Sequence, residues 1–234
     1  MNGRTHTRLH AAIAAIGQPV PAATWGHRIC AACVTCLPGV DAVAVTLRAD
    51  IDSLEIFGSS CDWGQNLEDA QYGFGEGPAR DAYALRAGEP VKSVQIERDP
   101  RWPIFGAYAA TVNAGAVTAL PLRLGAAPFG SLDLYSAGAQ AISDRTRDDA
   151  TTLTALTGRA LAEENDQAPW RIRSEVVYHD VDTACGMLAA HSDYTLADAL
   201  ARLRAHAFAT DQTLSCTAAD VIAGCVNLLP DAAD

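Results

Sequence analysis

The apolar residues of the chain recur with the two periods that distinguish helices from strands. A period near 3.6 residues predicts helices at 9–16 and 23–37, and prolines that follow each segment end them. Continuous apolar runs at 42–47 and 117–124 are instead typical of buried strands. The chain therefore combines both kinds of element from its beginning.

The segments between these elements show shorter versions of the same patterns. We expect strands at 54–59, 91–96 and 129–135, and helices at 66–71, 77–86 and 104–113. Residues 125–128 join two strands and predict a hairpin. A long helix follows from Asp144 to about Asn165, with Ser143 as the expected N-cap. Five or six strands mixed with helices predict an α+β domain.

The pattern changes at Pro169, beyond which only helices are expected. They cover residues 172–191, 195–209 and 215–229. Thr195, followed three residues later by Asp198, is typical of a capping box with Asp in place of Glu. Three such helices form a small bundle that is marginal as an independent unit. We therefore expect two domains, at residues 1–168 and 169–234.

The composition excludes several classes of protein. Of the 234 residues, 49% are hydrophobic and 19% are charged, which supplies a core and argues against intrinsic disorder. No run of 18 apolar residues occurs, so no membrane span is expected. The lack of a signal-peptide pattern indicates a cytoplasmic protein. The formal net charge of −11 repels nucleic acid and anionic membranes except at a local basic patch.

Three of the seven cysteines follow one another at equal spacing. Cys30, Cys33 and Cys36 form a C-x2-C-x2-C run, and Cys61 could supply the fourth thiolate that an iron–sulfur cluster needs. The same three residues lie in a helical pattern without the glycine or proline of a cluster-wrapping turn. This pattern favours a role as small apolar core residues over a metal site.

The motifs of common enzyme classes are missing from the sequence. It contains no H-E-x-x-H, no G-x-S-x-G and no P-loop, and its carboxylate pairs fall on a helix that we expect to be exposed. We therefore predict no catalytic residues and no enzyme. The sequence also does not identify a cofactor.

Five of the few aromatic residues cluster in one stretch of the chain. Aromatic walls are common in pockets for planar ligands, whereas ordinary core packing is the alternative role. The candidate ligand-binding residues are Tyr72, Phe74, Trp102, Phe105 and Tyr108.

The order of several motifs resembles the GAF domain of actinobacterial GAF–ANTAR regulators. The motifs that carry this resemblance include Gly75-Glu76-Gly77-Pro78, Asp99-Pro100-Arg101-Trp102-Pro103 and Gly130-Ser131-Leu132-Asp133-Leu134-Tyr135. The resemblance implies a GAF-like mixed sheet flanked by helices, which senses a small molecule or another signal.

The tail resembles the three-helix ANTAR domain of the same regulators. The matching motifs are Ala184-x-Gly186-Met187-Leu188, Ala199-x3-Leu203-Arg204-x2-Ala207 and Leu214-x3-Ala218-x2-Val221-Ile222. The resemblance implies an output domain that forms a homodimer, binds paired RNA hairpins and prevents transcription termination. The candidate RNA-binding residues are Ala184, Gly186, Arg202 and Arg204.

The tail also departs from the family pattern. Cys185 stands where a lysine is usual, and residues 170–234 hold four arginines against nine carboxylates. Each phosphate contact needs a nearby cation, so the acidic balance opposes RNA binding. Two alternatives to RNA output remain open. One is a sensor that acts through protein–protein contact, and the other is a redox or metal sensor that uses Cys30, Cys33 and Cys36.

Overall fold

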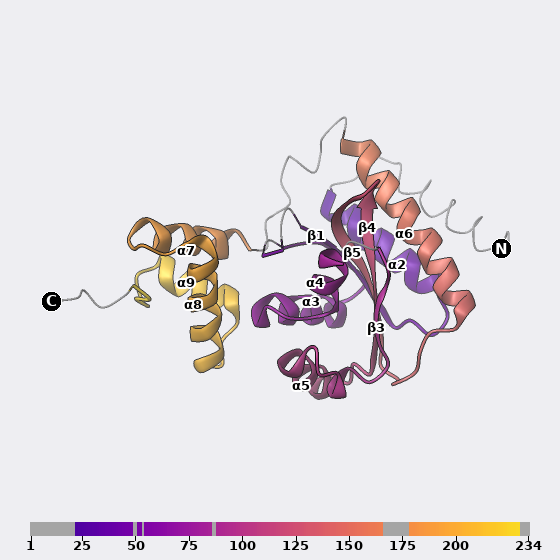
Figure 1. Cartoon of the computed structure of the whole chain (residues 1–234), viewed down its shortest axis with the longest axis horizontal. Helices are drawn as coiled ribbons and strands as arrows, with labels where there is room; N and C mark the ends of the chain where they lie inside the picture. Colours follow the sequence, from indigo (N-terminus) through magenta and orange to yellow (C-terminus); the bar gives the residue numbers. More distant parts are fainter. Residues whose placement is uncertain (1–21, 49–50, 53, 86–87, 166–177, 230–234) are drawn as a thin grey trace. The chain divides into compact units, whose positions relative to one another are not determined.

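The computed structural model describes residues 22–48, 51–52, 54–85, 88–165 and 178–229. These residues form two compact units (Figure 1). The first holds the helices and strands between Ala22 and Asn165, and the second holds three helices between His179 and Ile222. The expected helix at 9–16 and the expected border between residues 168 and 169 lie outside the described residues.

The first unit is built on an antiparallel sheet of five strands with the order β2-β1-β5-β4-β3. The strands are β1 (Ala42–Leu47), β2 (Glu55–Ser59), β3 (Val91–Ser93), β4 (Ala116–Leu124) and β5 (Ala127–Ser136). β4 and β5 form the predicted hairpin, in which Gly125 turns at a φ of +61°. The prediction of a mixed sheet is therefore corrected, because hairpins and returning connections make every described strand pair antiparallel.

Helices cover both faces of this sheet (Figure 1). One face packs against α2 (Ala22–Cys36) and α6 (Asp144–Asn165), and the other lies beneath α3 (Asp62–Phe74) and α4 (Pro78–Ala84). A 3₁₀ turn, η1 (Ile96–Arg98), packs beside α5 (Pro103–Thr111). Ser143 caps α6 as predicted, because the Thr146 N–H donates to its hydroxyl at 3.1 Å.

The main apolar core lies between the sheet and the pair α2 and α6. Leu132 and Leu134 of β5 point into it, together with Leu120 and Leu122 of β4. Burying side chains of this size contributes about 1.5–3 kcal/mol each. α2 approaches β2 closely where two glycines meet, because a Cβ on Gly58 would lie 2.3 Å from the Gly26 carbonyl carbon.

Three predicted elements differ from those in the structure. The helix expected at 66–71 runs from Asp62 to Phe74, because buried contacts along it outweigh the low helix propensity of its two glycines. The strand expected at 91–96 ends at Ser93, where the 3₁₀ turn follows. The last helix ends at Ile222, since Gly224 adopts a φ of +71° and ends the helical path.

The second unit consists of three helices that pack against one another. These are α7 (His179–Ala190), α8 (Leu196–Ala209) and α9 (Leu214–Ile222). The predicted capping box begins α8, because the Thr195 hydroxyl accepts from the Asp198 N–H and the Asp198 carboxylate accepts from the Thr195 N–H. Among the described residues, no helix is both long and apolar enough to span a membrane.

The three equally spaced cysteines all lie in α2 and differ in burial. Cys30 and Cys33 are fully buried in the apolar core, and Cys36 is half-buried. Within the described ranges, no group of three potential ligands is close enough to hold a metal ion. Cys30 and Cys33 therefore pack as core residues, and a redox or metal-sensing role for the run with Cys36 stays a prediction.

Burial makes these two thiols unreactive, which gives a first prediction. Burial raises the pKa of Cys33 to about 12, and a thiol with that pKa carries on the order of a thousandfold less thiolate at pH 8 than an ordinary thiol. In brief iodoacetamide labelling of the folded protein, mass spectrometry should find Cys216 and Cys225 modified, because both are exposed. Cys30 and Cys33 should react only after unfolding. Equal labelling of all four before unfolding would contradict their placement in the core.

Candidate functional site

The second face of the sheet carries polar side chains that are completely buried. Along β5, Ser131, Asp133 and Tyr135 alternate with the core leucines and therefore point to the opposite face. Thr46 of β1 lies beside them and shares a 2.8 Å hydrogen bond with Ser131. Burial of polar groups is unfavourable unless they are hydrogen-bonded, so their partners determine whether this face is stable.

The helix α3 supplies most of these partners. The Tyr135 hydroxyl donates to Glu68 Oε1 at 2.7 Å, and Gln71 Nε2 donates to Glu68 Oε2 at 3.0 Å. Gln71 Nε2 also lies 2.6 Å from the Tyr135 hydroxyl. Glu68 and Gln71 are three residues apart and share one face of the helix, so both reach the sheet.

Gln71 also connects this face to the start of α4. Its Oε1 atom accepts a hydrogen bond from the Ala79 N–H at 2.8 Å. Gly77 permits this approach, because a Cβ there would lie 2.2 Å from the same oxygen and its φ of +147° disfavours other residues. Pro78 occupies the first turn of α4, as the sequence predicted.

Asp133 is the least satisfied member of the group. Its Oδ2 atom accepts from the Ser131 hydroxyl at 2.7 Å. Its Oδ1 atom is buried and has no hydrogen-bond partner in the described part of the chain. The side chain is 0% exposed, so solvent does not reach this oxygen. A buried acceptor of this kind is a place where a ligand could donate a hydrogen bond.

Two acids and one guanidinium set the electrostatics of this region. Burial raises the pKa of Asp133 to about 7 and raises that of Glu68 well above its ordinary value, although the nearby Arg48 lowers both. Arg48 itself is only 7% exposed, and its Nη1 atom donates to the Ile51 carbonyl at 3.2 Å. We call Arg48, Glu68, Gln71, Asp133 and Tyr135 the buried polar cluster. It can hold a proton near neutral pH and can accept hydrogen bonds.

Of the five aromatic residues that the sequence predicts to bind a ligand, Tyr72 borders this cluster. Tyr72 is 3% exposed and acts electrostatically on Arg48, so it borders the cluster. Trp102 and Phe105 are buried, while Phe74 and Tyr108 are partly exposed. None of the five lines either of two cavities that lie beside α6. Their role in ligand binding stays a prediction.

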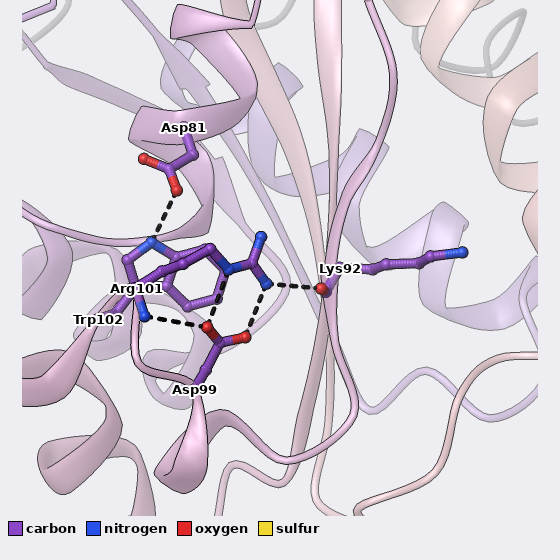
Figure 2. A network of polar contacts seen from close by, with 5 residues as sticks. All are labelled: Asp81, Lys92, Asp99, Arg101 and Trp102. Atoms are coloured by element: carbon purple, nitrogen blue, oxygen red, sulfur yellow. Dashed lines mark hydrogen bonds and ion pairs between the residues drawn. The ribbon is translucent and has the colours of Figure 1, made fainter.

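Trp102 belongs to a polar network that anchors the loop before α5 (Figure 2). Its indole N–H donates to Asp81 at 2.9 Å, and the Arg101 guanidinium lies 4.2 Å from its ring centroid. Arg101 donates to both oxygens of Asp99 and, through Nη2, to the Lys92 carbonyl at 2.8 Å. The hydrogen bonds from Arg101 lower the pKa of Asp99 to about 2. This network fixes the loop to β3 and α4.

Glu76, from the glycine-rich motif, has a capping role. Its Oε1 atom accepts from the backbone N–H groups of Ile104 and Phe105 at 2.6 and 2.8 Å. These are free donors at the start of α5, where a negative charge also interacts favourably with the helix dipole. The motif thus joins α4 and α5 and does not form a phosphate cradle.

The candidate RNA-binding residues occupy different environments in the second unit. Ala184 is fully buried and packs the bundle, whereas Gly186 is exposed on α7. Arg202 is exposed and stacks on Tyr194, with its guanidinium 4.5 Å from the ring centroid. Arg204 is half-buried, so the two arginines do not share one face of α8, as the helical period predicts.

Cys185, which replaces the usual lysine, is buried. Burial raises the pKa of its thiol to about 11, with Asp182 adding to the shift and Arg204 opposing it. A thiol at this position packs inside the unit and offers no cation to a phosphate. If the resemblance to the ANTAR domain holds, this position supplies no contact to RNA.

The sequence did not single out the buried polar cluster. Its members come from three separate segments, and none matches a short catalytic or metal-binding motif. One signal was present in the strand 129–135, where Ser131, Asp133 and Tyr135 alternate with leucines. An acidic residue in the middle of such a strand usually faces solvent, and only the packing of α3 shows that it is buried.

The raised pKa of Asp133 predicts how stability changes with pH. A carboxyl group whose pKa is raised by folding takes up a proton on folding, so the free energy of unfolding falls as pH rises from about 4 to 7. Asp133→Asn should reduce this fall, whereas Asp149→Asn on α6 should preserve it. Thermal melting at several pH values measures the effect, since about 1 kcal/mol shifts Tm by roughly 2–4 °C at this size. Parallel curves for wild type and Asp133→Asn would contradict the placement of the acid.

No family model matches the chain, and no curated protein matches its sequence. Solved structures do match its fold. The chain is similar to the GAF domain of a phosphoenolpyruvate-protein phosphotransferase from Coxiella burnetii, with a TM-score of 0.54 and 13% identity over 70% of this chain and 95% of that one.

Two further structures show the same similarity. A free methionine-R-sulfoxide reductase from Neisseria meningitidis, in complex with its substrate, gives a TM-score of 0.51 and 15% identity over 70% of this chain and 92% of that one. The phycocyanobilin-bound GAF domain of a cyanobacterial phytochrome gives 0.50 and 15%, over 72% and 98%. At this identity the similarity shows the fold alone. The predicted GAF-like α+β fold is confirmed, and the ANTAR assignment of the tail stays a prediction.

Proposed function

We propose that the chain is a cytoplasmic regulator in which the first unit senses a small molecule and the second unit transmits the signal. The buried polar cluster is the proposed sensing site. The observation that carries this proposal is Asp133, whose Oδ1 atom is fully buried beside a second buried acid and has no hydrogen-bond partner among the described residues. Perturbed buried acids gather at functional sites, because a core of apolar residues would be more stable.

The fold comparisons support a sensing role for the first unit. Two of the similar structures are described with a small molecule bound, a substrate in one and phycocyanobilin in the other. The proposed site of this chain is lined by carboxyl, phenol and guanidinium groups. A polar molecule with hydrogen-bond donors suits a cluster that is rich in acceptors. The proposal assigns no reaction to either unit.

Native mass spectrometry tests sensing without knowledge of the ligand. Protein purified under mild conditions should retain a small molecule, and the same spectrum reports the subunit number. Asp133→Asn and Glu68→Gln should retain less of it, because each changes a group of the cluster. Arg145→Gln, an exposed residue of α6, serves as the control and should retain as much as wild type.

A spectrum without a retained molecule can also result when the ligand dissociates during purification, so a second measurement is needed. A thermal-shift screen of the folded protein with a panel of small polar molecules provides this second measurement. A molecule that raises Tm in wild type and Arg145→Gln, but not in Asp133→Asn, supports the site. If no member of the panel raises Tm and no molecule is retained, the sensing proposal fails.

For the second unit, we propose binding of paired RNA hairpins as a homodimer, with prevention of transcription termination as the outcome. The support is the resemblance of the tail to the ANTAR domain and the presence of three packed helices. In the described part of the tail, the arginines are the exposed Arg202 and the half-buried Arg204 on α8. A homodimer would double their number, which matters in a tail with four arginines and nine carboxylates.

Hairpin binding can be measured with a pool of synthetic RNAs that each carry two short hairpins. The double variant Arg202→Gln/Arg204→Gln should bind at least about tenfold more weakly than wild type, because charge-assisted contacts to phosphate are lost. Its salt dependence should also become shallower, by about one unit of slope for each lost phosphate contact. Arg98→Gln, in the first unit, is the matched control. Equal affinity of the double variant, or no binding of the pool at low salt, would refute RNA output.

Exposed apolar residues of the second unit favour a different output, direct contact with a protein partner. Leu196 and Phe208 of α8 are 63% and 67% exposed, which is typical of surfaces that contact a protein partner. The same salt series separates the two outputs. RNA binding weakens steeply with salt, whereas apolar contact does not.

A further inference from the structure

Two neighbouring cavities lie beside α6, on the face of the sheet opposite the buried polar cluster. Their volumes are about 570 and 340 Å³. Leu120 lines the larger and Leu134 the smaller, and both leucines also belong to the apolar core beneath α2 and α6. Lys92 of β3 and Arg147 of α6 line both cavities, so we treat the two as one groove, the α6 groove. Its larger part has the size of ordinary ligand sites.

Cations gather in the α6 groove although the chain as a whole is acidic. The chain has 17 Lys and Arg residues against 28 Asp and Glu residues, and Lys92 is its single lysine. Arg123 adds a third cation to the larger cavity. Two carboxylates, Glu89 and Asp148, line the same cavity and leave one positive charge in excess. Among the lining residues the sign is thus opposite to that of the whole molecule, with Asp144 beside Arg147 as the nearest further carboxylate the structure pairs with this set.

The cations of the groove retain capacity to bind. Arg123 Nη2 donates to the Ala126 carbonyl, but its Nη1 atom is buried and has no hydrogen-bond partner among the residues that the structure describes. Arg147 pairs with Asp144, one turn away on α6, through a single nitrogen. A guanidinium has five N–H donors, so each arginine can still donate to an anion.

Lys92 is held in position by the network around Trp102. Its carbonyl accepts from Arg101 Nη2, and its backbone pairs with Thr118 of β4. The side chain points away from Arg101 and Asp99, out of the opposite side of the strand (Figure 2). The backbone of Lys92 is thus fixed in an edge strand. Less of the chain must therefore become ordered when an anion binds in the groove.

We propose that the α6 groove binds a small molecule that carries a phosphate or carboxylate group. The oxyanion lies between the Lys92 ammonium and the Arg147 guanidinium, with Arg123 as the third donor. Charge-assisted hydrogen bonds to such groups are short and strong in a partly buried site. The carboxylates Glu89 and Asp148 then accept from hydroxyl or amino groups elsewhere on the same molecule.

The location of the groove gives binding a structural consequence. Lys92 belongs to an edge strand of the sheet, and Arg147 lies in the first turn of α6. An oxyanion between them ties the helix to the sheet. In the sequence, α6 precedes the second unit. A ligand that strengthens the contact between α6 and the sheet would therefore act on the helix that leads into that unit. This site is separate from the buried polar cluster, which faces the other helices.

Isothermal titration of the full chain with pyrophosphate and with citrate tests the proposal. The two probes separate phosphate from carboxylate recognition, and binding of either supports the groove. Lys92→Gln and Arg147→Gln should each weaken binding about tenfold, the effect expected for loss of one charged hydrogen bond. Arg145→Gln is the matched control, because this exposed arginine is two residues from Arg147 and lines neither cavity.

The outcomes are distinct from those of the sensing experiment. Asp133→Asn should leave pyrophosphate or citrate binding unchanged, because that residue lies on the other face of the sheet. Unaltered far-ultraviolet circular dichroism confirms that each variant is folded. The inference is overturned if neither probe binds at millimolar concentration, or if binding survives in the double variant Lys92→Gln/Arg147→Gln.

Discussion

The burial of two carboxyl groups beside one guanidinium is the constraint on which the first unit depends. Transfer of an ionised acid from water into a protein interior costs several kcal/mol, even after relaxation. Glu68 accepts hydrogen bonds from Tyr135 and Gln71, whereas Asp133 has only one hydrogen-bonded oxygen among the described residues, and burial raises the pKa of both acids. These bonds also fix α3 against the sheet and the start of α4 against α3. The same interactions therefore build the fold and hold two acids with raised pKa values in its interior.

The two faces of the sheet carry different kinds of side chain, because successive residues of a strand point to opposite faces. Leu132 and Leu134 give one face to the apolar core with α2 and α6, while Ser131, Asp133 and Tyr135 give the other to the buried polar cluster. A shift of one residue in the pairing of β5 would exchange the two sets. Register is thus strongly specified, because the exchange would place a carboxylate among leucines.

Local patterns in the sequence predicted the elements well, and long-range packing explains what they missed. The β4–β5 hairpin, the Ser143 cap and the Thr195 capping box depend on neighbouring residues, so their signals are local. The buried polar cluster joins Glu68 to Tyr135, which is 67 residues away, and no local period reports such a contact. The aromatic residues show the same limit, since their clustering along the chain does not report that the Trp102 indole N–H donates to Asp81, 21 residues away, in a loop anchor.

The energetic scale of the proposed sensing is modest, and the structure offers interactions of that scale. Coupling between two sites is typically about 1–3 kcal/mol, and a ligand shifts an equilibrium only by its difference in affinity for the two states. One charged hydrogen bond contributes about 1.5–3 kcal/mol. A single contact made in one state and not in the other is therefore sufficient, either at Asp133 or between Lys92 and Arg147. Since α6 packs on the sheet and precedes the second unit in the sequence, movement of this helix is the route by which the proposed sensing would reach the tail.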